Sequence, residues 1–108
     1  MQQSFLFVSP GATDEKVLRI HYMEEKPENA KGLIIFLHGF PQFWYVWKPY
    51  LEHFSNKGFH VVAPDMRGFN DSDKPDAKAS YDMKYLMSDL LELMHHCGYD
   101  KAIVVGHE

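Results

Sequence analysis

A His-Gly-Phe-Pro turn follows the short apolar run Leu33–Leu37 and is the first stretch that suggests chemistry. Apolar runs without alternation belong to strands covered on both faces, and open parallel sheets bind ligands at the carboxyl ends of such strands. Gly39 permits close approach to the backbone, and Pro41 has no N–H. We therefore predict that the Phe40 N–H donates to a developing oxyanion, with His38, Gly39 and Pro41 supporting the loop. An ordinary strand-to-loop turn is the alternative.

A second motif begins after the apolar run Ala102–Val105, where the sequence reads Gly106-His107-Glu108. A nucleophile elbow has the pattern small–X–nucleophile–X–small on a tight turn that follows a strand. Gly106 fills the first small position, so Glu108 falls at the position of the nucleophile. The alternative is a strand that simply ends in these three residues.

A polar loop follows a third apolar run, Phe59–Ala63. Asp65 and Arg67 in this loop form either a catalytic pair or a structural ion pair beside the site. We favour the ion pair, because arginine prefers bidentate contacts with carboxylates. Trp44, shortly after the first turn, is expected to line an apolar substrate pocket, whereas Trp47 is better explained as helix core.

The seven histidines and the single cysteine predict no metal site and no cofactor. His95 and His96 are adjacent but have no cysteine or carboxylate ligand at a useful spacing. Each histidine is better explained by surface or loop packing than by general base catalysis. Cys97 is either a nucleophile or a small apolar side chain on a helix, and we favour the second interpretation.

The elements that position these motifs follow from hydrophobic periodicity. Val17 to Met23 is partly alternating, which predicts a half-buried strand. Trp47, Tyr50 and Leu51 begin an apolar stripe at helical spacing. The expected strands are residues 3–8, 17–23, 33–37, 59–63 and 102–105, and the expected helices are residues 44–56 and 81–97, with a long loop at 66–80. This order predicts an α/β sheet with an antiparallel start and a parallel continuation through crossover helices.

Length and composition exclude several classes of protein. The 108 residues suffice for one domain, and 45% hydrophobic content argues against disorder. The net charge of -4 argues against a nucleic-acid partner. No apolar run is long enough to span a membrane, and the lone cysteine fits a reducing, cytoplasmic compartment.

Three stretches together resemble a known family. They read HGFPQFWY at 38–45, DMRGFNDSDKP at 65–75 and GYDKAIVVGH at 98–107. The sequence resembles the α/β-hydrolase fold, and within it the branch of soluble epoxide hydrolases and haloalkane dehalogenases. The order and spacing look like an animal-type epoxide hydrolase from about Val17 onward.

The resemblance implies a two-step reaction on a small apolar epoxide. An Asp at the elbow would attack an epoxide carbon to form an alkyl-enzyme ester. A later His, held by a later acid, would activate the water that cleaves the ester, and two tyrosines of a helical cap domain would polarise the epoxide oxygen. The N–H groups of Phe40 and of the residue after the nucleophile would stabilise the oxyanion.

The sequence departs from the family pattern in two ways. Glu108 stands where the family has Asp, and a carboxylate moved by on the order of 1 Å can cost about a hundredfold in rate. The rest of the elbow, the cap, the relay acid and the relay His would all follow residue 108. We therefore expect residues 1–108 to be the N-terminal half of one α/β-hydrolase domain, truncated at the elbow, inactive alone and prone to unfolding or aggregation at an open sheet edge.

Two further functions stay open at this point. A haloalkane or haloacid dehalogenase would share the same motifs, and residues beyond 108 would distinguish it. The second open function is that of a non-catalytic relative that binds a small apolar ligand or a partner chain. Glu108, which stands where the family has Asp, favours this function.

Overall fold

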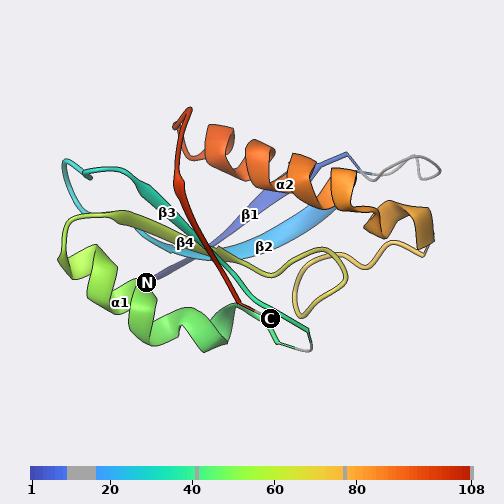
Figure 1. The fold of residues 1–108 in the computed structure, drawn as a ribbon, viewed down its shortest axis with the longest axis horizontal. Coiled ribbons are helices and arrows are strands. Elements are labelled where there is room, and N and C mark those ends of the chain that lie inside the picture. Colours follow the sequence, from blue (N-terminus) through green and yellow to red (C-terminus); the bar gives the residue numbers. More distant parts are fainter. Residues whose placement is uncertain (10–16, 41, 77, 108) are drawn as a thin grey trace.

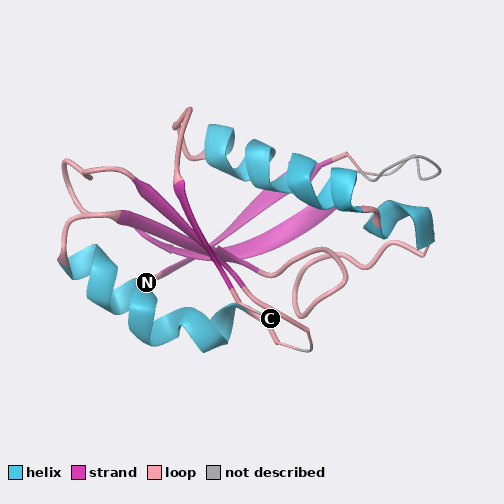
Figure 2. Ribbon diagram, viewed as in Figure 1, coloured by secondary structure: helices cyan, strands magenta, loops and turns pink. Residues whose placement is uncertain are grey.

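A five-stranded mixed sheet with one helix on each face forms the core of the molecule (Figures 1 and 2). The computed structural model describes residues 1–9, 17–40, 42–76 and 78–107, so Pro41 and Glu108 lie outside the described residues. The strands are β1 (Gln2–Val8), β2 (Leu18–Glu25), β3 (Leu33–Leu37), β4 (His60–Pro64) and β5 (Ile103–Gly106). The helices are α1 (Lys48–Asn56) and α2 (Met83–His96), each preceded by a 3-10 helix, at Trp44–Trp47 and Lys78–Tyr81.

The sheet has the order β1-β2-β4-β3-β5. β1 pairs antiparallel with β2, and β2 antiparallel with β4, whereas β3 pairs parallel with both β4 and β5. The predicted antiparallel start and parallel continuation are confirmed. Because β3, β4 and β5 are parallel, their carboxyl ends lie on the same side of the sheet, and the segments that follow them all start there.

The continuous apolar run of β3 serves two cores on opposite faces of the sheet. Ile34 and Phe36 pack with Trp47 and Leu51 on the face that α1 covers. Ile35, with Leu33, belongs to the core on the α2 face. Side chains alternate between the faces of a strand, so a strand covered on both sides needs apolar residues at every position.

Helix α1 begins later than its sequence pattern predicted. The segment Trp44–Trp47 is a 3-10 helix, and Pro49 lies in the first turn of the α-helix that follows. Proline is tolerated there because first-turn N–H groups have no partner within the helix. Trp47 and Leu51 are buried as expected, but Tyr50 from the same stripe is 51% exposed.

Two histidines differ from the prediction that all seven pack at the surface or in loops. His21 and His60 lie in strands and are buried, at 1% and 2% exposure, whereas His38, at 4%, is buried in the loop after β3 as predicted. The alternation of Val17 to Met23 predicted a half-buried strand, and Val17 and Arg19 are exposed, but the loop after β4 covers His21 on the same face. A buried polar side chain needs hydrogen-bond partners, and each of the three has at least one, although Nδ1 of His60 has none among the described residues.

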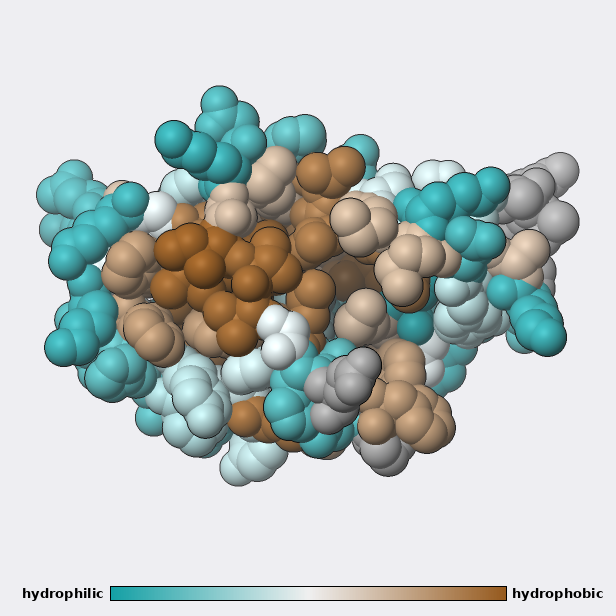
Figure 3. Space-filling model, in the orientation of Figure 1, coloured by the Kyte–Doolittle hydropathy of each residue, from teal (hydrophilic) through white to brown (hydrophobic). Residues whose placement is uncertain are grey.

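Strand β5 presents an apolar edge, as predicted. Among the described strands it pairs only with β3. Ile103 and Val104 are 54% and 48% exposed, and Figure 3 shows apolar residues gathered over β5. None of the helices in the described ranges is long and apolar enough to cross a bilayer.

Candidate functional site

The two motifs singled out in the sequence meet at the carboxyl ends of the neighbouring strands β3 and β5. β3 and β5 pair in a register that places Leu37 opposite Gly106. The His107 N–H extends this pairing by donating to the Leu37 carbonyl at 3.1 Å. The turn that begins at His38 and the residue before position 108 therefore leave the sheet side by side.

The turn after β3 is closed by Gln42. The Gln42 N–H donates to the Gly39 carbonyl at 2.8 Å, and the Gly39 N–H donates to Gln42 Oε1 at 3.3 Å. Phe40 at the tip is 81% exposed. Its N–H makes no hydrogen bond to the part of the chain that the structure describes. The turn thus holds Gly39 and leaves the Phe40 N–H available to an acceptor.

His38 links this turn to the loop after β4. Its Nε2 accepts a hydrogen bond from the Met66 N–H at 3.0 Å, and its Nδ1 lies 3.1 Å from the Gly39 carbonyl. A backbone N–H can only donate and a carbonyl can only accept, so the bonds assign a neutral ring with its proton on Nδ1. Both ring nitrogens are occupied, which fits the supporting role predicted for His38.

Asp65 lies at the centre of a buried hydrogen-bond network. Its Oδ1 accepts from the Trp44 N–H at 2.9 Å, and its Oδ2 accepts from Asn70 Nδ2 at 2.9 Å. The same Oδ2 lies 2.7 Å from Nδ1 of His21 on β2. One fully buried carboxylate therefore connects the start of the first 3-10 helix, the loop after β4 and strand β2.

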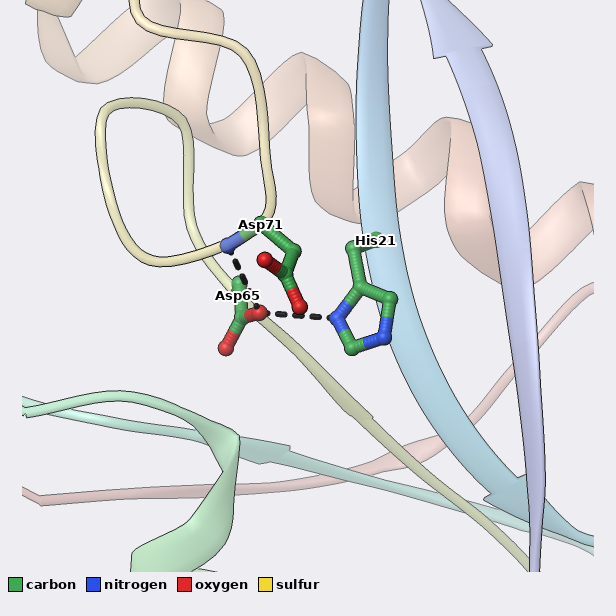
Figure 4. Close-up of side chains that lie close together, drawn as sticks. All are labelled: His21, Asp65 and Asp71. Carbon is green, nitrogen blue, oxygen red and sulfur yellow. Dashed lines mark hydrogen bonds and ion pairs between the residues drawn. The ribbon is translucent and has the colours of Figure 1, made fainter.

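His21, Asp65 and Asp71 are close enough to offer ligands to a metal ion, since one atom of each lies within 4.8 Å of the others (Figure 4). Their contacts already have another explanation. Asp65 Oδ2 accepts from His21 and from the Asp71 N–H, and His21 Nε2 contacts Gln3 Oε1 at 3.1 Å. We describe the three as a hydrogen-bond network, and the absence of a metal stays a prediction.

Arg67 does not form the predicted ion pair with Asp65. Its Nε and Nη2 each donate to a carboxylate oxygen of Asp89 on α2 at 2.7 Å, and its Nη1 donates to the Ser80 carbonyl at 2.7 Å. Burial raises the pKa of Asp89, and the hydrogen bonds and charge of Arg67 oppose that rise. The bidentate geometry that we expected is present, but its partner is 22 residues away.

Trp44 packs against the apolar core on the α1 face of the sheet. A cavity of about 240 Å³ lies on the α2 face, where Figure 3 shows the surface hollowed beside β5. Its apolar walls include Leu37, Met66, Leu86 and Leu93, and Trp44 does not line it. The role of Trp44 in a substrate pocket therefore stays a prediction.

A family profile described as alpha/beta hydrolase fold matches residues 32–107, which include the turn at His38, the loop after β4 and the second motif as far as His107. The chain belongs to the α/β-hydrolase fold family. Its curated relatives include several epoxide hydrolases. Epoxide hydrolase 1 of Caenorhabditis elegans is 42% identical over 93 residues, which cover 86% of this chain and 22% of the relative. Epoxide hydrolase 4 of Mus musculus is 40% identical over 84% of this chain and 25% of the relative.

Solved structures agree with this family membership. Epoxide Hydrolase A from Mycobacterium thermoresistibile matches with a TM-score of 0.82 and 31% identity, over 99% of this chain and 32% of that one. Epoxide hydrolase VrEH1 from Vigna radiata matches with a TM-score of 0.81 and 28% identity, over 98% of this chain and 32% of that one. The chain thus spans about a quarter of the length of its curated relatives.

Four residues of this α/β-hydrolase site were missed as site residues in the sequence. Gln42 and His107 lie inside family motifs, but nothing in their spacing shows that they contact each other across 65 residues. Asp89 stands on the predicted apolar stripe of α2, and a lone carboxylate on such a stripe is a usable sign of a buried cation partner. His21 gave no comparable sign.

Proposed function

We propose that this chain supplies part of the active site of an epoxide hydrolase, which converts a small apolar epoxide into a vicinal diol. The observation that carries the proposal is the meeting of the turn at His38–Phe40 with the end of β5, linked by the His107–Leu37 hydrogen bond. Nucleophile and oxyanion donors must stand within reach of one substrate atom, and the proposal is supported by the contact of residue 107, which precedes the proposed nucleophile, with the strand that leads into the turn at His38–Phe40. The epoxide hydrolases among the relatives support the substrate class.

The proposed reaction has two steps. A carboxylate oxygen of Glu108 attacks an epoxide carbon, the carbon–oxygen bond of the ring breaks, and the alkoxide takes a proton from acids outside this chain. Water then attacks the carbonyl carbon of the ester, and the Phe40 N–H stabilises the resulting oxyanion. The acyl carbon–oxygen bond breaks and the leaving oxygen takes one proton of the water, which releases the diol. The other proton returns to the acid that protonated the alkoxide, and the carboxylate is restored.

We expect residues 1–108 alone to form no diol. The relay His and acid that the family resemblance implies would follow residue 108, and the chain spans only about a quarter of the length of its curated relatives. The buried histidines of the described chain already have partners: His21 contacts Asp65, His38 contacts Met66, and His60 contacts Glu24. A cytoplasmic location belongs to the same proposal and rests on the lone Cys97.

The test uses the complete gene product that contains these residues. The protein is mixed in excess with an aryl epoxide in ¹⁸O-water for a single turnover. The ester route predicts that ¹⁸O enters the carboxylate of residue 108 and that the first diol contains none. Direct attack of water would place ¹⁸O in the diol at once and would overturn the proposed route. A protein that forms no diol at all would overturn the function.

A further inference from the structure

One oxygen atom, Oε1 of Gln42, lies between the two motifs of the proposed site. It accepts a hydrogen bond from the Gly39 N–H at 3.3 Å and lies 3.2 Å from Nδ1 of His107. Gly39 precedes the proposed oxyanion donor Phe40, and His107 precedes the proposed nucleophile Glu108. Gln42 is thus a side-chain bridge between the turn after β3 and the end of β5.

These contacts also assign the proton on the His107 ring. The Gly39 N–H can only donate, so the Gln42 atom that faces it is the carbonyl oxygen and not the amide nitrogen. The same oxygen can only accept from His107, so Nδ1 of that ring is the donor. Neutral His107 therefore has its proton on Nδ1, and its Nε2 lone pair is not used by this bridge.

Two further contacts hold His107 in place, one through its backbone and one through its ring. The His107 N–H donates to the Leu37 carbonyl at 3.1 Å. The ring meets Trp47 edge to face, with centroids 6.1 Å apart and planes at 90°. Trp47 itself is buried against Phe36 of β3. The backbone of residue 107 is thus tied to β3 and its ring to the α1 face, which leaves Gln42 to set the ring tautomer.

The geometry points to Gln42 as a positioning residue: its carbonyl oxygen fixes both the Gly39 amide and the His107 tautomer, and so keeps the oxyanion turn in register with the nucleophile. The inference rests on the proposed function for its catalytic consequence, but the hydrogen-bond bridge can be tested without any turnover. Displacement of a reacting group by about 1 Å can cost about a hundredfold in rate, which sets the size of effect to expect.

The first experiment measures the His107 tautomer in the complete gene product that contains these residues, from its ring ¹⁵N shifts at a pH where the ring is neutral. Gln42→Met has a similar length but no acceptor oxygen, and Gln42→Glu keeps the acceptor. Gln2→Met, at an exposed end of β1, is the matched control. We expect the Nδ1–H form in the parent chain, in Gln42→Glu and in the control, and loss of that preference in Gln42→Met. An unchanged tautomer in Gln42→Met would overturn the inference, as would an Nε2–H form in the parent.

The second experiment measures kcat and KM for diol formation by the complete gene product. We expect Gln42→Met to lower kcat by about tenfold to a hundredfold with little change in KM, and Gln42→Glu to restore most of the loss. Wild-type kcat in a folded Gln42→Met variant would overturn the positioning role. If the parent protein forms no diol, the proposed function fails, and the tautomer result still decides whether the bridge exists.

Discussion

Both carboxylate oxygens of Asp89 accept hydrogen bonds from the side chain of Arg67, from Nε and from Nη2, each at 2.7 Å. The Arg67 side chain is fully buried, and that of Asp89 is 15% exposed. The pair fastens the loop after β4 to α2, whereas Asp65 fastens the same loop to β2 and to the start of the first 3-10 helix. The Met66 N–H that holds His38 lies between these two anchors. The position of the turn after β3 therefore depends on a loop that is held from both sides.

Replacing Arg67 tests this anchor. Lysine keeps the charge but cannot donate two parallel hydrogen bonds, so we expect Arg67→Lys to lower the free energy of unfolding by about 2 kcal/mol. Arg19→Lys is the control, since Arg19 is exposed, and it should change stability by less than about 0.5 kcal/mol. Urea unfolding at neutral pH measures both. Equal stability of the two variants would show that the bidentate geometry contributes nothing.

Alanine substitutions at two glycines with nearly the same backbone conformation can distinguish the cost of backbone strain from the cost of a steric clash. Gly68 and Gly98 have φ of +88° and +89°. A Cβ at Gly68 would meet Cε1 of Tyr81 at 2.7 Å, whereas a Cβ at Gly98 has nothing within 4 Å. We expect Gly98→Ala to cost about 1–2 kcal/mol through the left-handed backbone alone. Gly68→Ala should cost about 1–3 kcal/mol more, because it also displaces the Tyr81 ring.

Chemical denaturation of both variants measures these costs, and a double variant checks their cause. In a Tyr81→Ala background the extra cost of Gly68→Ala should largely disappear, because the colliding ring is gone. If the extra cost remains in that background, Tyr81 is not its source.

Cys97 predicts how stability depends on alkaline pH. Burial, and next the charge of Glu24, raise the pKa of the Cys97 thiol from 9.0 to about 12. Above pH 9 the unfolded chain loses this proton before the folded chain does, so the unfolding free energy falls as pH rises from 9 toward 12. Cys97→Ala should reduce the fall between pH 8 and 10. The interval stops there because burial also raises the pKa of Tyr22 above its usual 10.0, which adds a fall of the same sign at higher pH.

The same thiol should react slowly with iodoacetamide. The thiolate is the reactive form, so we expect alkylation of the folded chain at pH 8 to be at least about tenfold slower than in urea. Mass spectrometry of the alkylated chain gives both rates. Comparable rates would show that Cys97 is an accessible, activated thiol and would revive its interpretation as a nucleophile.

Replacing Glu108 with aspartate is expected to increase activity. If Glu108 is the nucleophile, its extra methylene displaces the attacking oxygen relative to the aspartate of the family pattern. In the complete gene product we therefore expect Glu108→Asp to raise kcat for epoxide opening by up to about a hundredfold. Glu108→Gln, which cannot attack, should abolish turnover. A faster Gln variant, or an Asp variant slower than the parent, would remove residue 108 from the nucleophile role.

The sequence by itself determined the elements of the fold and predicted where the candidate site would lie. Period-two and continuous apolar runs predicted all five strands to within two residues at each end, because the faces that a strand buries dictate its pattern. Helical stripes closed by Gly58 and Gly98 predicted both helices, since only glycine readily takes the positive φ that ends them. The location of the candidate site at the carboxyl ends of the parallel strands was predicted from the motifs that directly follow those strands.

The tertiary structure alone decided which polar groups meet. Arg67 pairs with Asp89 and not with Asp65, which is nearer in the sequence. The packing of α2 on the sheet brings the carboxylate of Asp89 to the buried guanidinium. His21 is buried because the loop after β4 folds over β2, and Gln42 reaches His107 because β5 lies beside β3. The hydrophobic pattern of a strand or helix is a property of residues close together in the sequence, so it can be recognised without the tertiary structure. Hydrogen-bond and ion-pair partners are chosen by distance in space, which only the assembled sheet and helices define.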